Sequence, residues 1–327
     1  MRDRRFVLGI AIVAAGIGAT TLSATDPAAG AATVVLLFGA AAAPVGVLLV
    51  VLARADAPIA SLRAAIGGAV VGPVVALASH AAVAAFAYAF FLGFADAGRA
   101  LLDALRIDPR LHEVIASPWT IVFLVDLAVV APMTEEAGKA LGGFLFARPR
   151  SRREAFVIGA CAGTGFAVVE NVLYAGLAAA FGGPWQLVVI ARTVSAPVHV
   201  LASGVVALGV WDGRRQDRPG ALLRGYAGGV GVHALWNGSL VVLLIAATAG
   251  SGAPPGIEDL LQLVFSATLG VVLAAVLWRV AGRVSGTDRR SLQVRMRAPV
   301  AGWVLLASSL LVPVAVLLVV FPAFRGA

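Results

Sequence analysis

The chain has 327 residues, of which 60% are hydrophobic and only 13% are charged. Soluble domains carry about 25% charged residues, so this composition excludes a soluble globular protein and predicts a polytopic membrane protein. The formal net charge is +8. In a membrane protein such an excess indicates topology, and we expect no nucleic-acid partner. The single cysteine, Cys161, excludes an intramolecular disulfide.

Nine apolar stretches have about the 20 residues that a helix needs to cross a bilayer. They lie near residues 6–24, 33–53, 66–93, 119–147, 156–181, 185–210, 222–247, 259–281 and 299–321. The first stretch could pass for a signal peptide, but we favour a retained signal anchor because further spans follow. The predicted fold class is therefore an all-α bundle of eight or nine transmembrane helices, with residues 1–327 forming a single transmembrane domain.

Basic residues are distributed unevenly between the loops. If the N-terminus is cytosolic and the spans alternate, 19 of the 25 lysines and arginines lie on the cytosolic side and four on the outer side. This bias predicts a cytosolic N-terminus and an outer C-terminus by the positive-inside rule. Between the third and fourth spans, residues 94–118 mix leucines with charged residues, which predicts a short amphipathic helix on the outer surface.

The most informative feature lies in the fourth span, where Glu135, Glu136 and Lys139 interrupt apolar sequence. A charged group at the bilayer centre costs about 2.5–3.5 kcal/mol, so the three together cost on the order of 10 kcal/mol. The span is stable only if these groups face a protein interior or a wet cavity. Lys139 is also the single lysine of the chain. A structural ion pair explains one carboxylate but not both, so we expect a functional site here.

The next three spans carry polar side chains that apolar packing does not need. They are Glu170 and Asn171, then Ser195, His199 and Ser203, and finally His233 and Asn237. Counted from the cytosolic ends, Glu135, Glu170 and the two histidines lie at a common depth of about 16–21 Å. The i,i+4 spacing of Glu135–Lys139, His199–Ser203 and His233–Asn237 places each pair on one helix face. We therefore predict a four-helix catalytic core over residues 119–240.

Glutamate and histidine in a shielded cavity are typical of a hydrolase. A carboxylate can take a proton from water, and two histidines can hold a metal or stabilise an oxyanion. The amide of Asn237 is a further oxyanion donor. The competing interpretations are an internal salt bridge for Glu170 and ordinary buried histidines at 199 and 233. His80, in the third span, belongs to no motif, and we expect a structural role for it.

Two further charges lie nearer the outer side. Asp126 and Arg192 are each the eighth residue inward from the outer ends of the fourth and sixth spans. Because equal depth favours contact, we predict an ion pair between them that braces the two helices.

Four motifs in order resemble the PrsW family of intramembrane proteases, within the superfamily of CAAX prenyl proteases. They read Glu135-Glu136-Ala-Gly-Lys139, Phe166-Ala-Val-Val-Glu170-Asn171, His199-Val-Leu-Ala-Ser203 and His233-Ala-Leu-Trp236-Asn237. The resemblance covers roughly residues 119–240. It implies an endopeptidase of the bacterial plasma membrane that cleaves a membrane-anchored protein substrate within or near the bilayer. Because some family members cut anti-sigma factors, we expect a regulatory substrate.

The resemblance also implies residue roles. One glutamate of Glu135 and Glu136 would activate water, Glu170 and His199 would complete the water or metal site, and His233 and Asn237 would stabilise the oxyanion. The supporting residues would be Lys139, Phe166, Asn171 and Ser203. Two questions stay open: which glutamate is the base, and whether a divalent metal such as zinc is held by Glu170, His199 and His233 or the glutamate acts without metal.

Two other functions compete with proteolysis. Intramembrane glutamate and histidine also mark ion or proton transporters, although the sequence shows no inverted repeat. A non-catalytic membrane scaffold held together by the polar cluster is the third interpretation. The sequence gives no indication of the oligomeric state.

Overall fold

The computed structural model describes residues 27–55, 57, 61–104, 118–180, 185–215, 218–248 and 257–285. Within these ranges every regular element is a helix, and no strand is present. The predicted all-α class is therefore confirmed for the described part of the chain. The first and last predicted spans, 6–24 and 299–321, lie outside the described residues.

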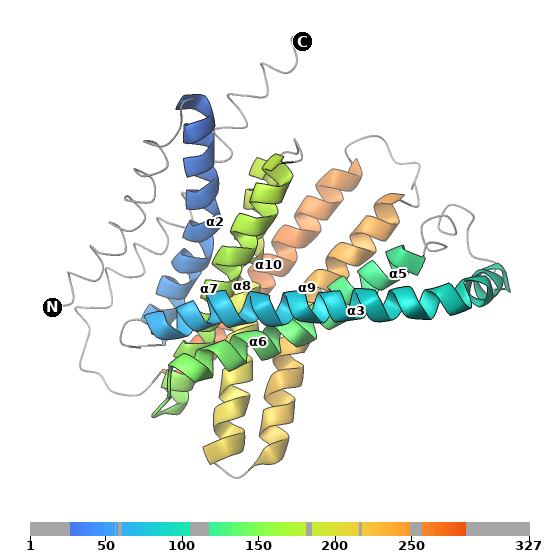
Figure 1. The fold of residues 1–327 in the computed structure, drawn as a ribbon. Coiled ribbons are helices and arrows are strands. Elements are labelled where there is room, and N and C mark those ends of the chain that lie inside the picture. The colour runs from blue at the N-terminus through green and yellow to red at the C-terminus, as the bar shows by residue number, and fades with distance from the viewer. Residues whose placement is uncertain are drawn as a thin grey trace. The chain divides into compact units, whose positions relative to one another are not determined.

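The helices follow the other predicted spans. They are α2 (Pro27–Arg54), α3 (Leu62–Ala104), α5 (Pro118–Val125), the π-helical turn η1 (Asp126–Val130), α6 (Ala131–Phe146), α7 (Arg152–Ala180), α8 (Trp185–Arg215), α9 (Pro219–Thr248) and α10 (Ile257–Val284), as Figure 1 shows. Four stretches are long and apolar enough to cross a membrane, namely Leu62–Phe86, Arg152–Ala178, Ala191–Arg215 and Val264–Val284. The chain is thus an integral membrane protein, while the count of eight or nine spans and the orientation stay predictions.

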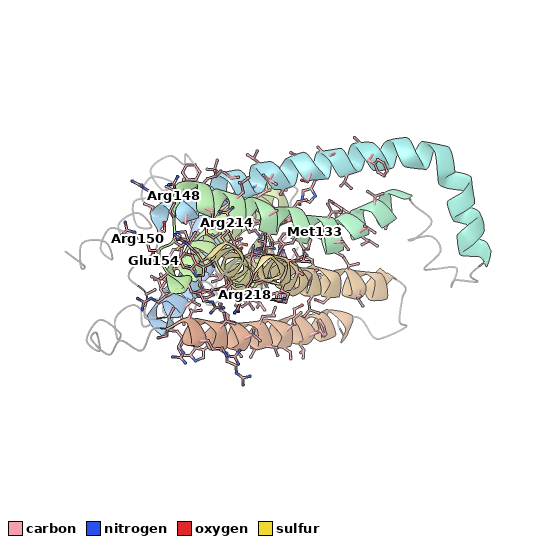
Figure 2. The ribbon with its side chains drawn as sticks, turned by 90° about the horizontal axis from the view of Figure 1, so that it is seen from below. Met133, Arg148, Arg150, Glu154, Arg214 and Arg218 are labelled. Atoms are coloured by element: carbon pink, nitrogen blue, oxygen red, sulfur yellow. The ribbon has the colours of Figure 1, made fainter. Side chains whose placement is uncertain are left out.

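The third helix is longer than the sequence indicates. α3 continues without a break to Ala104, so residues 94–104 extend this helix instead of forming a separate element. The charges at Asp96 and Arg99 mark a change in polarity, but the alanine and leucine around them favour helix and nothing there stops it. The C-terminal part of α3 bends away from the rest of the helix in Figure 2. Residues 105–117 of the predicted amphipathic segment lie outside the described residues.

Helix starts are set by local side chains. The Ser61 hydroxyl accepts a hydrogen bond from the Ala64 amide at 3.2 Å and caps α3. At α7, the Ser151 hydroxyl accepts from the Glu154 amide at 3.1 Å, and the Glu154 carboxylate accepts from the Arg150 amide at 2.7 Å. This reciprocal arrangement is close to a capping box and fixes the first turn of α7.

The fourth predicted span is not one uninterrupted α-helix. It consists of α5, the turn η1 and α6, and the Ala131 amide donates to the carbonyl of Asp126, five residues back. Pro132 follows directly and has no amide hydrogen to continue the α-helical ladder. The proline therefore explains why the helix widens here, immediately before the Glu135–Glu136 pair.

The chain divides into two compact units, and the one with residues 54–166 and 197–286 holds most of the candidate site. In this unit α3 lies along α6 and contacts α5, while α9 packs against η1 and α6 and contacts α10 (Figure 1). A Cβ at Gly67 would collide with the Gly142 carbonyl, and a Cβ at Gly142 with the Gly67 carbonyl. These glycines let the backbones of α3 and α6 touch, as small residues do between membrane helices.

A second close approach joins α7 to α8 within the same unit. A Cβ at Gly159 would meet the Ser203 carbonyl, and one at Gly163 would meet the His199 carbonyl. This spacing brings the backbone of α7 against the turn of α8 that carries His199 and Ser203. Small residues on α7 therefore fix the position of two of the predicted site residues.

The other unit comprises residues 1–53, 167–196 and 287–327. Its described elements are α2 up to Ala53, α7 from Ala167 and α8 up to Ala196. The Asn171 side chain on α7 donates to the Ala40 carbonyl of α2 at 2.9 Å. A buried side-chain amide thus ties these two helices together.

Candidate active site

The charged triplet of α6 forms one buried ionic cluster. The Lys139 ammonium lies 3.1 Å from Glu135 Oε2 and 2.7 Å from Glu136 Oε1. The side chains of Lys139 and Glu136 are fully buried, and that of Glu135 is 8% exposed. Residues 135, 136 and 139 lie on adjacent turns of one helix, so α6 alone can bring the three charges together.

His199 of α8 completes the surroundings of the lysine. Its Nδ1 lies 3.0 Å from Lys139 Nζ, and Lys139 Nζ lies 4.0 Å from the centroid of the Phe166 ring. The Phe166 ring also packs against the His199 ring, with centroids 5.6 Å apart. Phe166 thus provides a cation–π contact and a wall for the imidazole, which explains an aromatic residue in this motif.

His233 of α9 and Ser203 of α8 converge on the second glutamate. His233 Nδ1 lies 3.0 Å from Glu136 Oε1, and the Ser203 hydroxyl donates to Glu136 Oε2 at 2.8 Å. The rings of His199 and His233 meet edge to face, with centroids 4.8 Å apart. Three helices of one unit, α6, α8 and α9, therefore bring five ionisable side chains into direct contact.

These hydrogen bonds decide which ring nitrogens carry protons. A carboxylate only accepts, so His233 Nδ1 donates to Glu136, and in the neutral ring Nε2 keeps its lone pair. That Nε2 lies 3.8 Å from Glu135 Oε2. A lysine ammonium only donates, so His199 Nδ1 accepts from Lys139, and a neutral His199 carries its proton on Nε2. The two histidines are therefore held in different tautomers.

Glu135, His199 and His233 form a group that could hold a metal ion. One ligand atom from each lies within 4.8 Å of the others, and all three residues are buried. Carboxylate oxygen and imidazole nitrogen are the ligands of catalytic zinc sites, and Glu136 orients His233 as an outer carboxylate does in such sites. The donor set fits a divalent ion, with the condition that His199 must exchange its contact with Lys139 for the ion or shift its proton.

The predicted metal set differs from this group. The sequence placed Glu170 beside the two histidines, whereas the structure has Glu135 in that position. Glu170 belongs to the other unit, where its carboxylate forms an ion pair with Arg192. Arg192 Nε also donates to the side-chain oxygen of Asn171 at 2.6 Å. The internal salt bridge, weighed above as the alternative for Glu170, is the interaction observed.

The structure shows a different partner for each member of the predicted pair of Asp126 and Arg192. Asp126 Oδ2 lies 2.7 Å from His80 Nδ1 on α3, and Arg192 pairs with Glu170. Asp126 is the first residue of the π-helical turn. Depth counted along a straight α-helix gives the height of this side chain but not the direction in which it points. This contact links α3 to the turn, and a structural role for His80 stays a prediction.

Asn237 of α9 satisfies a backbone group of the π-helical turn. Its side-chain amide donates to the Leu127 carbonyl at 3.0 Å. The helical donors for that carbonyl are missing, because the Ala131 amide donates to Asp126 and Pro132 has no amide hydrogen. Asn237 thus braces the irregular backbone that leads into Glu135.

Tyr226 is a neighbour of the site that the sequence analysis missed. Its hydroxyl donates to the Met133 carbonyl at 2.7 Å, two residues before Glu135. Tyr226 precedes His233 by seven residues, so both lie on one face of α9. That spacing was the signal in the sequence that could have identified it.

Ser195, which stands one turn before His199, donates its hydroxyl hydrogen to the Arg192 carbonyl of its own helix at 3.0 Å. This bond is local to α8, and it leaves Ser203 as the serine that contacts the buried cluster.

A family model described as PrsW family intramembrane metalloprotease matches residues 28–257. No curated protein and no solved structure matches the chain significantly. The matched range contains every side chain of the buried cluster and most of the helices described above. With its apolar helices and its buried Glu–His–His group, the chain belongs to the PrsW family of intramembrane metalloproteases.

Proposed function

We propose that the buried cluster of Glu135, Glu136, Lys139, His199 and His233 is the catalytic centre for peptide-bond hydrolysis in a membrane-anchored protein. The observation that carries this proposal is their convergence from three helices at buried positions. Intramembrane ionisable residues are costly and mark functional sites by default. Glutamate can accept a proton from water, and imidazole can ligate an ion or donate to an oxyanion.

Glu135 is the glutamate that we assign to the reacting water. Both oxygens of Glu136 are engaged, one by Lys139 and His233 and the other by Ser203. Glu136 is also fully buried, whereas Glu135 keeps some exposed surface. These contacts compete with a reacting water for the oxygens of Glu136. Glu136 therefore serves to position the histidine and the lysine.

Glu135, His199 and His233 are the residues that would hold a divalent ion such as zinc. When bound, such an ion supplies Lewis acidity, which activates water and polarises the scissile carbonyl. Whether Glu135 binds the ion or accepts a proton, the reacting water lies beside its carboxylate. Glu170, in its ion pair with Arg192, supports the helices instead.

The oxyanion would be stabilised by donors on α9. Asn237 has two amide hydrogens, and one of them is used by the Leu127 carbonyl. The other is the donor that we assign to the carbonyl oxygen of the substrate. His233 Nε2 can donate only if it is protonated, and it can ligate an ion only if it is not. The two roles inferred for His233 therefore exclude each other in a single protonation state.

We also propose the cellular setting. The chain would lie in a bacterial plasma membrane as one transmembrane domain of eight or nine spans, with its N-terminus inside and its C-terminus outside. Residues 119–240 would form the catalytic core. The substrate would be a regulatory membrane-anchored protein cut within or near the bilayer, as the arginine distribution and the family membership favour.

The experiment is a comparison of new protein N-termini in membranes that contain equal amounts of wild type or of the Glu135→Gln/Glu136→Gln variant. We expect at least one membrane-protein fragment to require the wild type and to be lost in the variant. Glu154→Gln, a glutamate substitution at the start of α7, is the matched control and should retain the fragment. Identical fragment patterns from folded wild type and variant would refute proteolysis by this cluster.

A further inference from the structure

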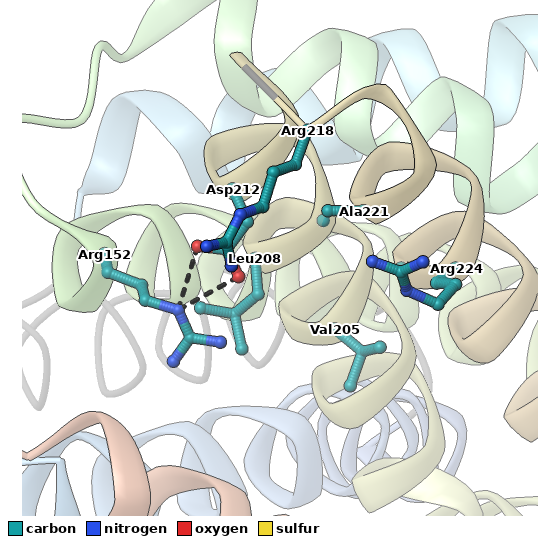
Figure 3. A pocket seen from close by; sticks show the side chains of 9 residues that line it. Arg152, Val205, Leu208, Asp212, Arg218, Ala221 and Arg224 are labelled. Atoms are coloured by element: carbon teal, nitrogen blue, oxygen red, sulfur yellow. Dashed lines mark hydrogen bonds and ion pairs between the residues drawn. The ribbon is translucent and has the colours of Figure 1, made fainter. Parts of the chain in front are cut away.

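A cavity separate from the Glu–His cluster lies where α7 begins and α8 ends. Its volume is about 310 Å³, and its charged lining residues are Arg152, Asp212, Arg218 and Arg224 (Figure 3). Three arginines against one aspartate give the lining a net charge of +2. The volume is at the lower end of the range of small-ligand sites, about 300–1,000 Å³.

Only one of the three arginines of this cavity forms an ion pair among the described residues. Arg152 Nε donates to both carboxylate oxygens of Asp212, at 3.0 and 3.1 Å, and its terminal nitrogens point away from that carboxylate (Figure 3). Among the described residues, no carboxylate forms an ion pair with Arg218 or Arg224. Guanidinium groups of this kind bind phosphate through charge-assisted and often paired hydrogen bonds.

The cavity lies at the end of membrane-crossing stretches. Arg152 is the first residue of one candidate span, and Asp212 lies in the last turn of another. Neighbouring Trp211 stacks with Arg215, 5.3 Å from ring centroid to guanidinium carbon, and tryptophan is typical of the membrane–water interface. Figure 2, drawn from below, shows Arg148, Arg214 and Arg218 on this side of the unit. The ends of helices that cross a bilayer lie at the headgroup level, so we expect the cavity there.

The lining changes from charged to apolar along one helix face. Asp212, Leu208 and Val205 follow each other on α8 at spacings of four and three residues, so they form a single stripe. The stripe leads from the arginine-rich rim into the apolar part of the span. A small soluble anion would use only the rim, whereas an amphiphile would use both ends.

We propose that this cavity binds the phosphate headgroup of an anionic phospholipid. Arg218 and Arg224 hold the phosphate, Arg152 contributes from its pairing with Asp212, and the first apolar groups of the lipid lie against Leu208 and Val205. Basic pockets between membrane helices on the cytoplasmic side are a recurrent way of binding such headgroups. The site is independent of the catalytic assignment, since none of its residues belongs to the buried cluster.

The test is native mass spectrometry of the detergent-purified full chain titrated with phosphatidylglycerol, with phosphatidylcholine or with inorganic phosphate. We expect wild type to bind phosphatidylglycerol more tightly than the other two. Arg218→Gln/Arg224→Gln should weaken phosphatidylglycerol binding by about thirtyfold, as expected for two arginines facing an anionic headgroup. Arg218→Lys/Arg224→Lys keeps the charge and should weaken phosphatidylglycerol binding less.

The matched control is Arg279→Gln/Arg283→Gln, which removes the same charge from exposed positions on α10. It should bind phosphatidylglycerol within a few-fold of wild type. Equal weakening in both double variants would mean general surface attraction and would overturn the site. Equal binding of inorganic phosphate and phosphatidylglycerol would overturn the lipid as the source of the phosphate. Unchanged binding in the Arg218/Arg224 variant would refute the proposal outright.

Discussion

At the scale of residues, Lys139 connects the parts of the cluster. Its ammonium contacts both glutamates and His199, and the same ammonium lies over the Phe166 ring. An ammonium has three hydrogens, and these three acceptors match them. The lysine therefore holds two adjacent carboxylates at a buried position and sets the tautomer of His199 at the same time.

We predict that Lys139→Met strongly destabilises the protein. Removing one partner of a buried ion pair leaves an uncompensated charge and costs about 3–5 kcal/mol. The measurement is unfolding of the purified protein in detergent. The matched variant is Arg152→Gln, which breaks an ion pair whose arginine side chain is 47% exposed and should cost about 1 kcal/mol or less. Equal losses of unfolding free energy in the two variants would show that Lys139 does not stabilise the cluster.

The residues of the cluster were predictable to different degrees. The motifs identified Glu135, Glu136 and Lys139, because charge inside an apolar span is conspicuous in one sequence. The partner of Glu170 was missed, since depth along a helix gives height but not the direction in which a side chain points. Arg192 also lies inside a span, and pairing the two intramembrane charges of opposite sign would have been the better inference.

At the scale of elements, the π-helical turn before α6 lacks a backbone hydrogen-bond donor, and a side chain of α9 replaces it. Pro132 removes a backbone donor, and Asn237 supplies a side-chain donor to the Leu127 carbonyl. The turn lies directly before the glutamate pair. The geometry of the glutamate pair therefore depends on a contact from α9.

We predict that Asn237→Leu destabilises the protein by about 1–3 kcal/mol, because the Leu127 carbonyl loses its donor in a partly buried place. Cleavage should fall as well. Ser239→Ala is the control, since the Ser239 hydroxyl donates only within its own helix, to the Trp236 carbonyl at 2.7 Å. Its cost should stay within about 0.5 kcal/mol. The measurements are unfolding and fragment formation for both variants. An Asn237→Leu protein as stable as wild type would show that the contact with Leu127 does not stabilise the turn.

The packing of α7 on α8 gives another prediction. A methyl group at Gly163 would meet the carbonyl of His199 and the hydroxyl of Ser203, so Gly163→Ala should push the helices apart and cost about 1–3 kcal/mol. At Gly231 of α9 nothing lies within 4 Å of an added Cβ. Gly231→Ala should be neutral or stabilising by up to about 1 kcal/mol. Similar unfolding temperatures for the two variants would contradict the close approach.

The helix boundaries were also predicted only in part from the sequence. Apolar length alone located α7, α8 and α10, because a membrane helix must match the bilayer thickness. It did not locate the end of α3, since a helix continues past the bilayer wherever its sequence favours helix. It also missed the π-helical turn, which depends on one proline and on a donor from a distant helix.

At the scale of the whole molecule, arginine distribution and helix order predict an orientation in the membrane, and this orientation can be measured. The predicted topology puts the loop around Ser151 in the cytosol and Ser251 outside. In a Cys161→Ala background, Ser251→Cys should react with a membrane-impermeant maleimide in intact cells. Ser151→Cys should react only after the membrane is opened. The reverse pattern would invert the topology and place the arginine-rich cavity outside.

Glu135 is the residue to which we assign the activation of water for peptide hydrolysis within the membrane. The most direct measurement is cleavage by the purified protein in proteoliposomes of the substrate identified by its new N-terminus. We predict that Glu135→Gln reduces the rate by about 100-fold or more, the typical contribution of a general base, while Glu154→Gln cleaves at the wild-type rate. A folded Glu135→Gln protein that cleaves as fast as wild type would contradict the assignment.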